Sequence, residues 1–157
     1  MVNLSVIVPF YNEEIYLEKS VHRLLENNIY EKIILIDNNS TDNSNYIAHQ
    51  LAKQNKNIRV HKTGIERGKG SALTYSKQFI ETSHVVIHDA DLEYFPDDII
   101  EMFKLCEENP NSLILGSRFI GNEERKNVYF RTSLANRVMS LFLSLINFYY
   151  ISDVASC

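Results

Sequence analysis

Short apolar runs alternate with longer amphipathic segments along nearly the whole chain, and this alternation restricts the fold more than any other feature of the sequence. Apolar runs predict five strands, at residues 4–10, 32–37, 57–63, 84–89 and 112–119. Amphipathic periodicity predicts five helices, at residues 12–28, 44–53, 71–82, 95–109 and 131–152. Such alternation is typical of a parallel sheet. We therefore expect an α/β fold, with a mostly parallel sheet and helices on both faces.

The first predicted helix carries a start signal. Asn12 is a residue type that caps helices, and Glu13 and Glu14 would suit the first turn, where negative charge is favoured. We therefore expect helix 12–28 to begin directly after Asn12.

The composition excludes several classes of protein. With 157 residues, of which 45% are hydrophobic and 23% charged, the chain is expected to form one globular domain. Its formal net charge of −4 argues against a nucleic-acid binder held by bulk charge. The two cysteines, Cys106 and Cys157, predict neither disulfides nor structural zinc. Because the sequence shows no leader and no membrane-spanning apolar run, we expect a cytoplasmic protein, free or at the cytoplasmic face of a membrane.

Polar and charged side chains collect where the predicted strands end. In parallel sheets, ligands bind at the carboxyl ends of the strands. The residues at those ends are Tyr11, Glu13, Asp37, Asp89, Asp91, Ser117 and Arg118. One edge of the sheet is therefore expected to hold carboxylates, a tyrosine and an arginine.

The sequence Asp89–Ala90–Asp91 is the most informative of these strand ends. Two carboxylates spaced two residues apart repel each other unless a cation compensates them. Hard oxygen ligands suit Mg²⁺ or Mn²⁺, which also take substrate phosphates as ligands. The alternative is that Asp91 only begins a turn before Pro96. The spacing alone leaves both interpretations open.

Single residues elsewhere give weaker indications. Asp37 could accept hydrogen bonds from a nucleobase or a ribose, or could satisfy backbone groups of the following turn. Lys69 lies in a glycine-containing loop that enters a helix, where phosphate could bind, although the loop is not a P-loop. His88 follows an apolar run and is interpreted as a packed histidine.

Two arginines offer a second kind of anion site. Arg118 and Arg131 carry rigid guanidinium groups that suit an anionic substrate, or they could form surface salt bridges with Glu123 or Glu124. For either arginine taken singly, the salt bridge is the simpler interpretation.

Five stretches in this order, VIVPFYNEE, IILIDNNSTDNS, ERGKGSAL, HDADLEYFPDD and GSRF, resemble family 2 inverting glycosyltransferases of GT-A fold. The closest subgroup is the dolichyl- or polyprenyl-phosphate glycosyltransferases. The resemblance covers nearly the whole chain, residues 1–157, as a single domain. It implies a Rossmann-like GT-A sheet and inverting transfer of a sugar from a UDP- or GDP-linked nucleotide sugar to a polyprenyl or dolichyl phosphate, assisted by Mg²⁺ or Mn²⁺.

The resemblance also implies roles for individual residues. It places the nucleoside against Pro9, Tyr11, Glu13 and Asp37. It assigns the metal to Asp89 and Asp91, with Glu93 as a third ligand. It assigns the acceptor phosphate to Arg118 and Arg131, with Ser133 and Asn136 nearby.

The sequence departs from the family pattern in two places. The second acid of the usual DDGS motif is Asn38 here, which weakens the expected role of that position. Residues 151–157 resemble the start of a segment that ends in a basic residue in the family, so we expect the C-terminal part of the domain to be missing. An alternative function is therefore a catalytically incomplete domain that binds nucleotide or assembles with a partner. A nucleotidyltransferase is less consistent, because no glycine-rich signature accompanies the first strand.

The charged residues of the chain suit a phosphate acceptor. A lipid phosphate is already ionised near neutral pH and needs no general base. This fits a chain that has arginines but few carboxylates in its C-terminal part.

The apolar segment 141–151 is too short to span a bilayer. It could meet a membrane interface, where Tyr149 and Tyr150 are suited, or pack against a second copy in a homo-oligomer.

Overall fold

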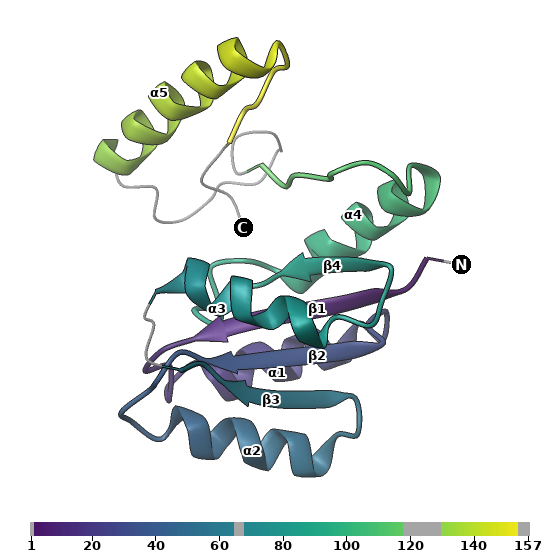
Figure 1. Cartoon of the computed structure of the whole chain (residues 1–157), viewed down its shortest axis with the longest axis vertical. Helices are drawn as coiled ribbons and strands as arrows, with labels where there is room; N and C mark the ends of the chain where they lie inside the picture. The colour runs from purple at the N-terminus through teal and green to yellow at the C-terminus, as the bar shows by residue number, and fades with distance from the viewer. Residues whose placement is uncertain (1, 65–67, 118–129, 154–157) are drawn as a thin grey trace. The chain divides into compact units, whose positions relative to one another are not determined.

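The computed structural model describes residues 2–64, 68–117 and 130–153, apart from the side chains of 130–135 and 147. The chain forms two compact units, Met1–Ser112 and Leu113–Cys157. Figure 1 shows the first unit built around a sheet and the second around one long helix.

The sheet of the first unit has four strands, β1 (Leu4–Phe10), β2 (Lys32–Asp37), β3 (Ile58–Lys62) and β4 (His84–Ile87). Their order across the sheet is β3-β2-β1-β4, and each neighbouring pair is parallel. Strands β1 and β2 occupy the centre, which explains why both are almost entirely apolar. The predicted α/β fold with a parallel sheet is confirmed.

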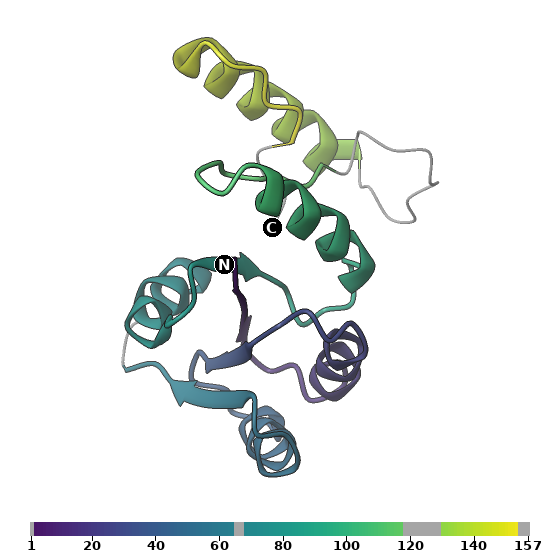
Figure 2. The same cartoon turned by 90° about the vertical axis from the view of Figure 1, so that its right-hand side faces the viewer.

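Helices cover both faces of this sheet, as Figure 2 shows. They are α1 (Leu17–Glu26), α2 (Ser44–Gln54), α3 (Lys69–Ser76), followed by the short 3₁₀ helix η1 (Lys77–Phe79), and α4 (Pro96–Glu108). Alternate strand residues point to opposite faces. Ile33 and Leu35 therefore share a core with α1, α2 and α4, whereas Ile34 and Ile36 share the other core with α3.

The start of the first helix differs from the prediction. Helix α1 begins at Leu17, and Asn12 does not cap it. Asn12 instead has a left-handed backbone, with φ of 55°, and its Oδ1 accepts a hydrogen bond from the backbone N–H of Thr41 at 2.8 Å. Because the Asn12 side chain is engaged in this hydrogen bond to a second loop, it is not available to cap the helix. The polar stretch 11–16 is therefore a loop rather than a first helical turn.

The predicted fifth strand, 112–119, is wrong over the residues that the structure describes. Residues 113–117 have no strand backbone, and both Leu113 and Leu115 are exposed. An apolar run becomes a strand only when a neighbouring strand supplies hydrogen bonds, and β propensity alone does not provide one. Residues 118 and 119 lie outside the described residues.

The second unit contains α5 (Phe130–Asn147) and a returning segment. The helix ends earlier than the predicted residue 152, because Phe148 adopts a left-handed φ of 53° and reverses the chain. Ile151 then donates its backbone N–H to the Ser144 hydroxyl at 2.8 Å, and Asn136 donates to the Asp153 carboxylate at 2.5 Å. Within the ranges that the structure describes, no helix is long and apolar enough to cross a bilayer.

Candidate active site

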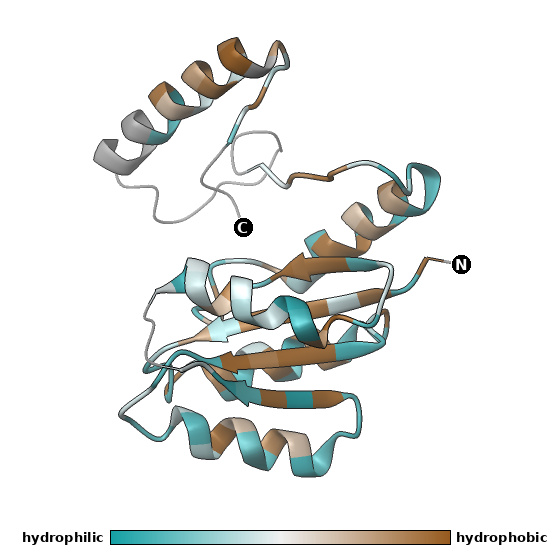
Figure 3. Cartoon of the chain, in the orientation of Figure 1, coloured by the Kyte–Doolittle hydropathy of each residue, from teal (hydrophilic) through white to brown (hydrophobic). Residues whose placement is uncertain are grey.

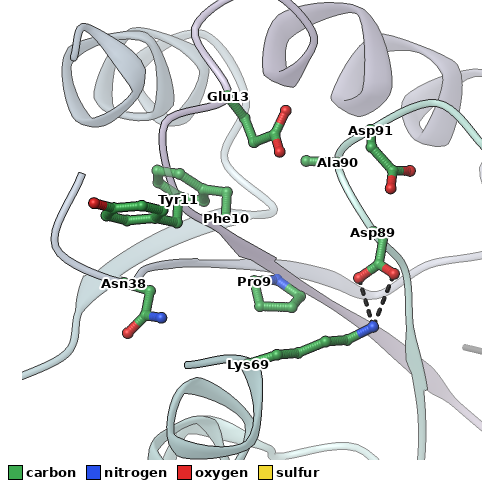
Figure 4. Close-up of a pocket in the computed structure, with 9 residues that line it drawn as sticks. All are labelled: Pro9, Phe10, Tyr11, Glu13, Asn38, Lys69, Asp89, Ala90 and Asp91. Atoms are coloured by element: carbon green, nitrogen blue, oxygen red, sulfur yellow. Dashed lines mark hydrogen bonds and ion pairs between the residues drawn. The ribbon is translucent and has the colours of Figure 1, made fainter. Parts of the chain in front are cut away.

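A cavity of about 270 Å³ opens at the carboxyl edge of the sheet in the first unit (Figure 4). The end of β1, the end of β2, the start of α3 and the loop after β4 all contribute to its wall. The lining residues are Pro9, Phe10, Tyr11, Glu13, Asn38, Lys69, Asp89, Ala90 and Asp91. The site is thus located where parallel sheets commonly bind ligands.

The loop after β1 is held in place by the loop after β2. The backbone N–H of Asn12 donates to the Ser40 hydroxyl at 3.1 Å, and that of Glu13 donates to the Ser44 hydroxyl at 2.7 Å. These bonds satisfy the backbone of a segment that has no regular structure of its own. They fix the stretch that presents Tyr11 and Glu13 to the cavity.

The loop after β4 supplies the two aspartates. The Oδ1 of Asp91 accepts the backbone N–H of Glu93 at 3.0 Å, closing a turn around Leu92. Leu92 has a left-handed φ of 65°, which is unusual for a branched apolar residue. Such strain persists only where the surroundings impose it, and it is often found at binding sites.

Lys69 forms an ion pair with the first aspartate. Its Nζ is 2.8 Å from both carboxylate oxygens of Asp89. Figure 4 shows the lysine side chain extending from the start of α3 to the carboxylate. A basic group and the acidic pair therefore share one wall of the cavity.

The cavity concentrates negative charge. Partial burial, followed by the nearby carboxylates of Asp91, Asp42 and Asp89, raises the pKa of Glu13 above its ordinary value. The same field would favour the binding of a cation. His88, just before the acidic pair, does not line the cavity and is buried, and burial lowers the pKa of its imidazole. The interpretation of His88 as a packed histidine agrees with this placement.

The last residue of β2, Asp37, and the residue that follows the strand lie differently from one another. Asp37 is fully buried and its carboxylate accepts hydrogen bonds from Ser40 and Asn45. It does not line the cavity, whereas the next residue, Asn38, does.

The structure brings together most of the residues predicted from sequence. Pro9, Tyr11, Glu13, Lys69, Asp89 and Asp91 all line the cavity. Glu93 is exposed and absent from the lining, and among the described residues no three potential metal ligands are grouped. Arg118 lies outside the described residues. Arg131 is in α5, and its side chain is not described.

Sequence reasoning missed three lining residues, Phe10, Asn38 and Ala90. Phe10 and Ala90 are neighbours of predicted site residues and could have been included on that ground. Asn38 replaces the acid expected at its position, which weakens the indication from the motif. Its place directly after a central strand is the signal that could have identified it.

The model of the family described as glycosyl transferase family 2 matches residues 5–154. The chain belongs to glycosyl transferase family 2. The match covers both compact units, and it agrees with the resemblance seen in the five sequence motifs.

Curated relatives of this family 2 domain include two named for dolichyl phosphate. One is UDP-N-acetylglucosamine–dolichyl-phosphate N-acetylglucosaminyltransferase of Methanococcus voltae, 29% identical over 98% of this chain and 66% of the relative. Another is dolichol-phosphate mannosyltransferase of Saccharomyces cerevisiae, 29% identical over 75% of this chain and 45% of the relative. The domain thus spans about half to two thirds of the length of these relatives.

Solved structures support the same fold. The mannosyltransferase PcManGT of Pyrobaculum calidifontis, in complex with GDP-Man and Mn²⁺, superposes with a TM-score of 0.60 and 25% identity. The match covers 66% of this chain and 32% of that chain. The expected GT-A type of α/β fold is confirmed.

Proposed function

We propose that this family 2 domain transfers a sugar from a UDP- or GDP-linked nucleotide sugar to a polyprenyl or dolichyl phosphate, with inversion at the sugar C1. The observation that carries the proposal is the composition of the cavity wall. Tyr11 offers an aromatic surface for a base, Lys69 offers a cation for phosphate, and Asp89 and Asp91 offer metal ligands. These three kinds of group suit the base and the diphosphate of a nucleoside diphosphate.

The individual roles follow from the chemistry of each side chain. We assign the nucleoside to Pro9, Tyr11 and Glu13, with Asp37 as the residue that anchors the wall behind them. Lys69 is assigned to the diphosphate, because its ammonium already lies at the cavity wall. Its present partner, Asp89, would then be shared with a divalent cation.

The cavity fits a divalent cation. Three carboxylates line it, those of Glu13, Asp89 and Asp91, and burial followed by the neighbouring carboxylates raises the pKa of Glu13, so positive charge would relieve a repulsion that is already present. Asp91 and Asp89 would hold Mg²⁺ or Mn²⁺, with Glu93 as a further candidate. When bound, the cation would neutralise charge on the diphosphate leaving group. Mn²⁺ accompanies the nucleotide sugar in the PcManGT structure.

The proposed transfer exchanges one bond for another at the sugar C1. An oxygen of the lipid phosphate forms a bond to C1 from the face opposite the leaving group, and the bond from C1 to the nucleoside diphosphate breaks. A phosphate monoester, with a second pKa of about 6, is already largely ionised at pH 7, so no general base is required. The protein has only to position the acceptor and compensate its charge, and we assign that role to Arg118 and Arg131. Two relatives named for dolichyl phosphate support this choice of acceptor.

The proposal can be tested by calorimetry with UDP and GDP, with and without Mn²⁺, and by transfer of labelled sugar to polyprenyl phosphate. We expect metal-dependent binding of one of the two nucleotides. Asp91→Asn should weaken it tenfold or more, about 1.4 kcal/mol. Asp98→Asn, at the exposed start of α4, is the matched control and should leave binding unchanged. Equal affinity in excess chelator would contradict the metal role.

A catalytically incomplete domain is the second candidate, and the incomplete coverage of the relatives is the observation that favours it. Such a domain would still bind the nucleotide with metal. Only the transfer assay separates the two, because binding without transfer in the presence of lipid phosphate would favour the binding or assembly function.

We further propose that the exposed apolar surface of α5 and its C-terminal turn is covered by a second copy of the chain or by a lipid interface. The residues are Val138, Met139, Leu141, Phe142, Leu145, Ile146, Phe148, Tyr149 and Tyr150. So large an apolar surface is uncommon on a monomer in water. Light scattering with and without lipid vesicles tests this, and a stable monomer that ignores vesicles would contradict it.

A further inference from the structure

The ion pair between Lys69 and Asp89 engages a carboxylate that the proposed function assigns to a metal ion. The lysine Nζ is 2.8 Å from each carboxylate oxygen of Asp89, so the ammonium bridges the two oxygens. In Figure 4 both dashed lines from Lys69 end on this one carboxylate. A positive charge from the protein itself therefore already compensates the first residue of the acidic pair.

The two aspartates of the acidic pair have different partners. The Oδ1 of Asp91 accepts the backbone N–H of Glu93 at 3.0 Å, which is a neutral donor. Asp89 instead faces the full charge of the Lys69 ammonium. A cation that bound the Asp89 carboxylate would lie next to this ammonium, and like charges at such short range repel each other. Lys69 and a divalent cation therefore compete for Asp89.

The lysine is able to leave the aspartate at low cost. The side chain of Lys69 is 43% exposed and that of Asp89 is 23% exposed, and ion pairs that water screens in this way contribute little stability. Lys69 is the first residue of α3, and its long, flexible side chain can turn while the backbone of the helix stays in place. A ligand that offers the ammonium a stronger anion can therefore break the pair.

A diphosphate is an anion of this kind. Three carboxylates line the cavity, those of Glu13, Asp89 and Asp91, and Lys69 is the one cation among the described residues of its wall. A diphosphate in this cavity would be repelled by the carboxylates unless positive charge compensated it. If the ammonium turned toward the diphosphate, it would provide part of that charge and would release the oxygens of Asp89.

We infer that Lys69 couples the binding of the metal to the binding of the nucleoside diphosphate by exchanging partners. Before a ligand binds, the ammonium holds Asp89 and weakens the affinity of the acidic pair for a divalent cation. When the diphosphate binds, the ammonium turns to it, and Asp89 becomes available to the cation. This inference rests on the proposed function, in which the cavity binds a nucleoside diphosphate together with Mg²⁺ or Mn²⁺. Because coupling is reciprocal, each ligand should raise the affinity for the other by the same factor.

The first measurement uses Mn²⁺ alone, in calorimetry or by the electron paramagnetic resonance signal of free Mn²⁺. Lys69→Met removes the competing charge and should bind Mn²⁺ about fivefold more tightly than wild type. Lys69→Gln, a second neutral variant, should give the same result. Lys69→Arg keeps a charge that can pair with Asp89 and should bind Mn²⁺ as weakly as wild type. Thermal melts show whether each variant is folded.

The matched control is Lys62→Met, at the end of β3. It removes one lysine from the same edge of the sheet, but the ammonium of Lys62 lies 3.9 Å from Asp37 and is not paired with Asp89. Loss of this more distant charge should leave the affinity for Mn²⁺ close to that of wild type. The comparison separates the contact with Asp89 from a general effect of net charge.

The second measurement repeats the Mn²⁺ titration with saturating UDP or GDP. In wild type, one of the two nucleotides should raise the affinity for Mn²⁺ about tenfold or more. In Lys69→Met the factor should be smaller, because no ammonium has to leave Asp89. The factor that remains in this variant measures the direct attraction between the metal and the phosphates.

The two measurements separate this inference from the proposed function. If Lys69→Met binds Mn²⁺ alone no more tightly than wild type, or if Lys62→Met strengthens binding as much, the ammonium does not compete for Asp89 and the inference is wrong. The same coupling factor in Lys69→Met and wild type would also overturn it. If wild type binds neither nucleotide with Mn²⁺, the proposed function and the coupling both fail, and the titration with Mn²⁺ alone still decides whether lysine and metal compete.

Discussion

The two compact units differ in whether they bury apolar side chains. In the first unit, the central strands bury an almost unbroken series of apolar residues between two layers of helices. In the described part of the second unit, the buried side chains are polar, those of Asn136, Ser140 and Asp153, and no apolar residue is buried. Figure 3 shows apolar colour both in the strands and along the C-terminal part of α5.

This difference shows which part of the chain can stabilise itself. Burial of apolar surface is the main favourable contribution to folding, and the first unit obtains it from its own elements. In α5, Asn136 and Ser144 instead form hydrogen bonds with the returning segment, and the apolar side chains of the helix remain exposed. A helix arranged in this way is expected to gain stability from an apolar partner. The first unit therefore provides the rigid frame of the cavity, independently of what covers α5.

The largest expected effect comes from one residue type compared across the two units. Leu35 is 0% exposed in β2, and Leu141 is 63% exposed in α5. Leu35→Ala should lower the free energy of unfolding by about 2–5 kcal/mol, because it removes buried contacts and leaves a cavity. Leu141→Ala should change it by less than about 0.5 kcal/mol in the monomer. Urea unfolding followed by circular dichroism measures both. A comparable loss for Leu141→Ala would show that α5 is covered in solution.

A buried aspartate in each unit gives the next comparison. Asp37→Ala removes the acceptor of two hydrogen bonds, those donated by the Ser40 N–H and the Asn45 amide. It should lower the free energy of unfolding by about 1–3 kcal/mol. Asp153→Ala should leave that transition unchanged, because Asp153 accepts a hydrogen bond from Asn136 and both residues belong to the second unit. Its effect should appear locally, as faster amide exchange at Ile151. Destabilisation of the first unit by Asp153→Ala would mean that the units unfold together.

Nucleotide binding should also be confined to the first unit. Lys69→Met removes the only described cation on the cavity wall and should weaken nucleoside diphosphate binding about tenfold, roughly 1.4 kcal/mol. Lys77→Met, on the exposed 3₁₀ helix, is the matched control within the unit, and Arg137→Met in α5 is the control for the second unit. Both controls should bind like wild type in calorimetry. An unchanged affinity for Lys69→Met would remove the lysine from the site.

The sequence predicted the first unit better than the second, for physical reasons. Buried parallel strands are marked by apolar residues on both faces, so β1 and β2 were located to the residue. The run 112–119 has the same composition but lacks a pairing strand over its described residues, and composition does not show whether a partner exists. The cap predicted at Asn12 failed because a loop distant in sequence competes for its side chain.

The candidate site shows the same limit. Strand ends located the carboxylates and Tyr11 at the correct edge, because that edge follows from the parallel topology. Periodicity did not determine which of Asp37 and Asn38 faces outward, since the turn after β2 sets the direction of both side chains. That choice depends on Thr63 and Asn45, which belong to other elements. Contacts between elements are the part of the site that a sequence pattern does not encode.

The smallest effect concerns pH, and it also separates the two units. All five histidines lie within residues 1–112, so any change in stability due to histidine between pH 7.5 and 5.5 must arise in the first unit. Burial, followed by the charge of Arg59, lowers the pKa of His61, whose ring stacks on Phe79 with centroids 3.5 Å apart. The unfolded chain therefore binds the proton more readily than the folded one.

It follows that the contribution of His61 to stability is fully present above its ordinary pKa of about 6.5 and is lost as the pH falls below that value. His61→Gln should flatten the decline of unfolding free energy between pH 7.5 and 5.5. The slope is the quantity to compare, because the lost ring stacking shifts the absolute stability at every pH. His49→Gln, exposed on α2, is the matched control for the substitution itself. Part of the decline should remain in His61→Gln, since burial also lowers the pKa of His88. A slope identical to wild type would show that His61 binds its proton equally well in the folded and unfolded chain.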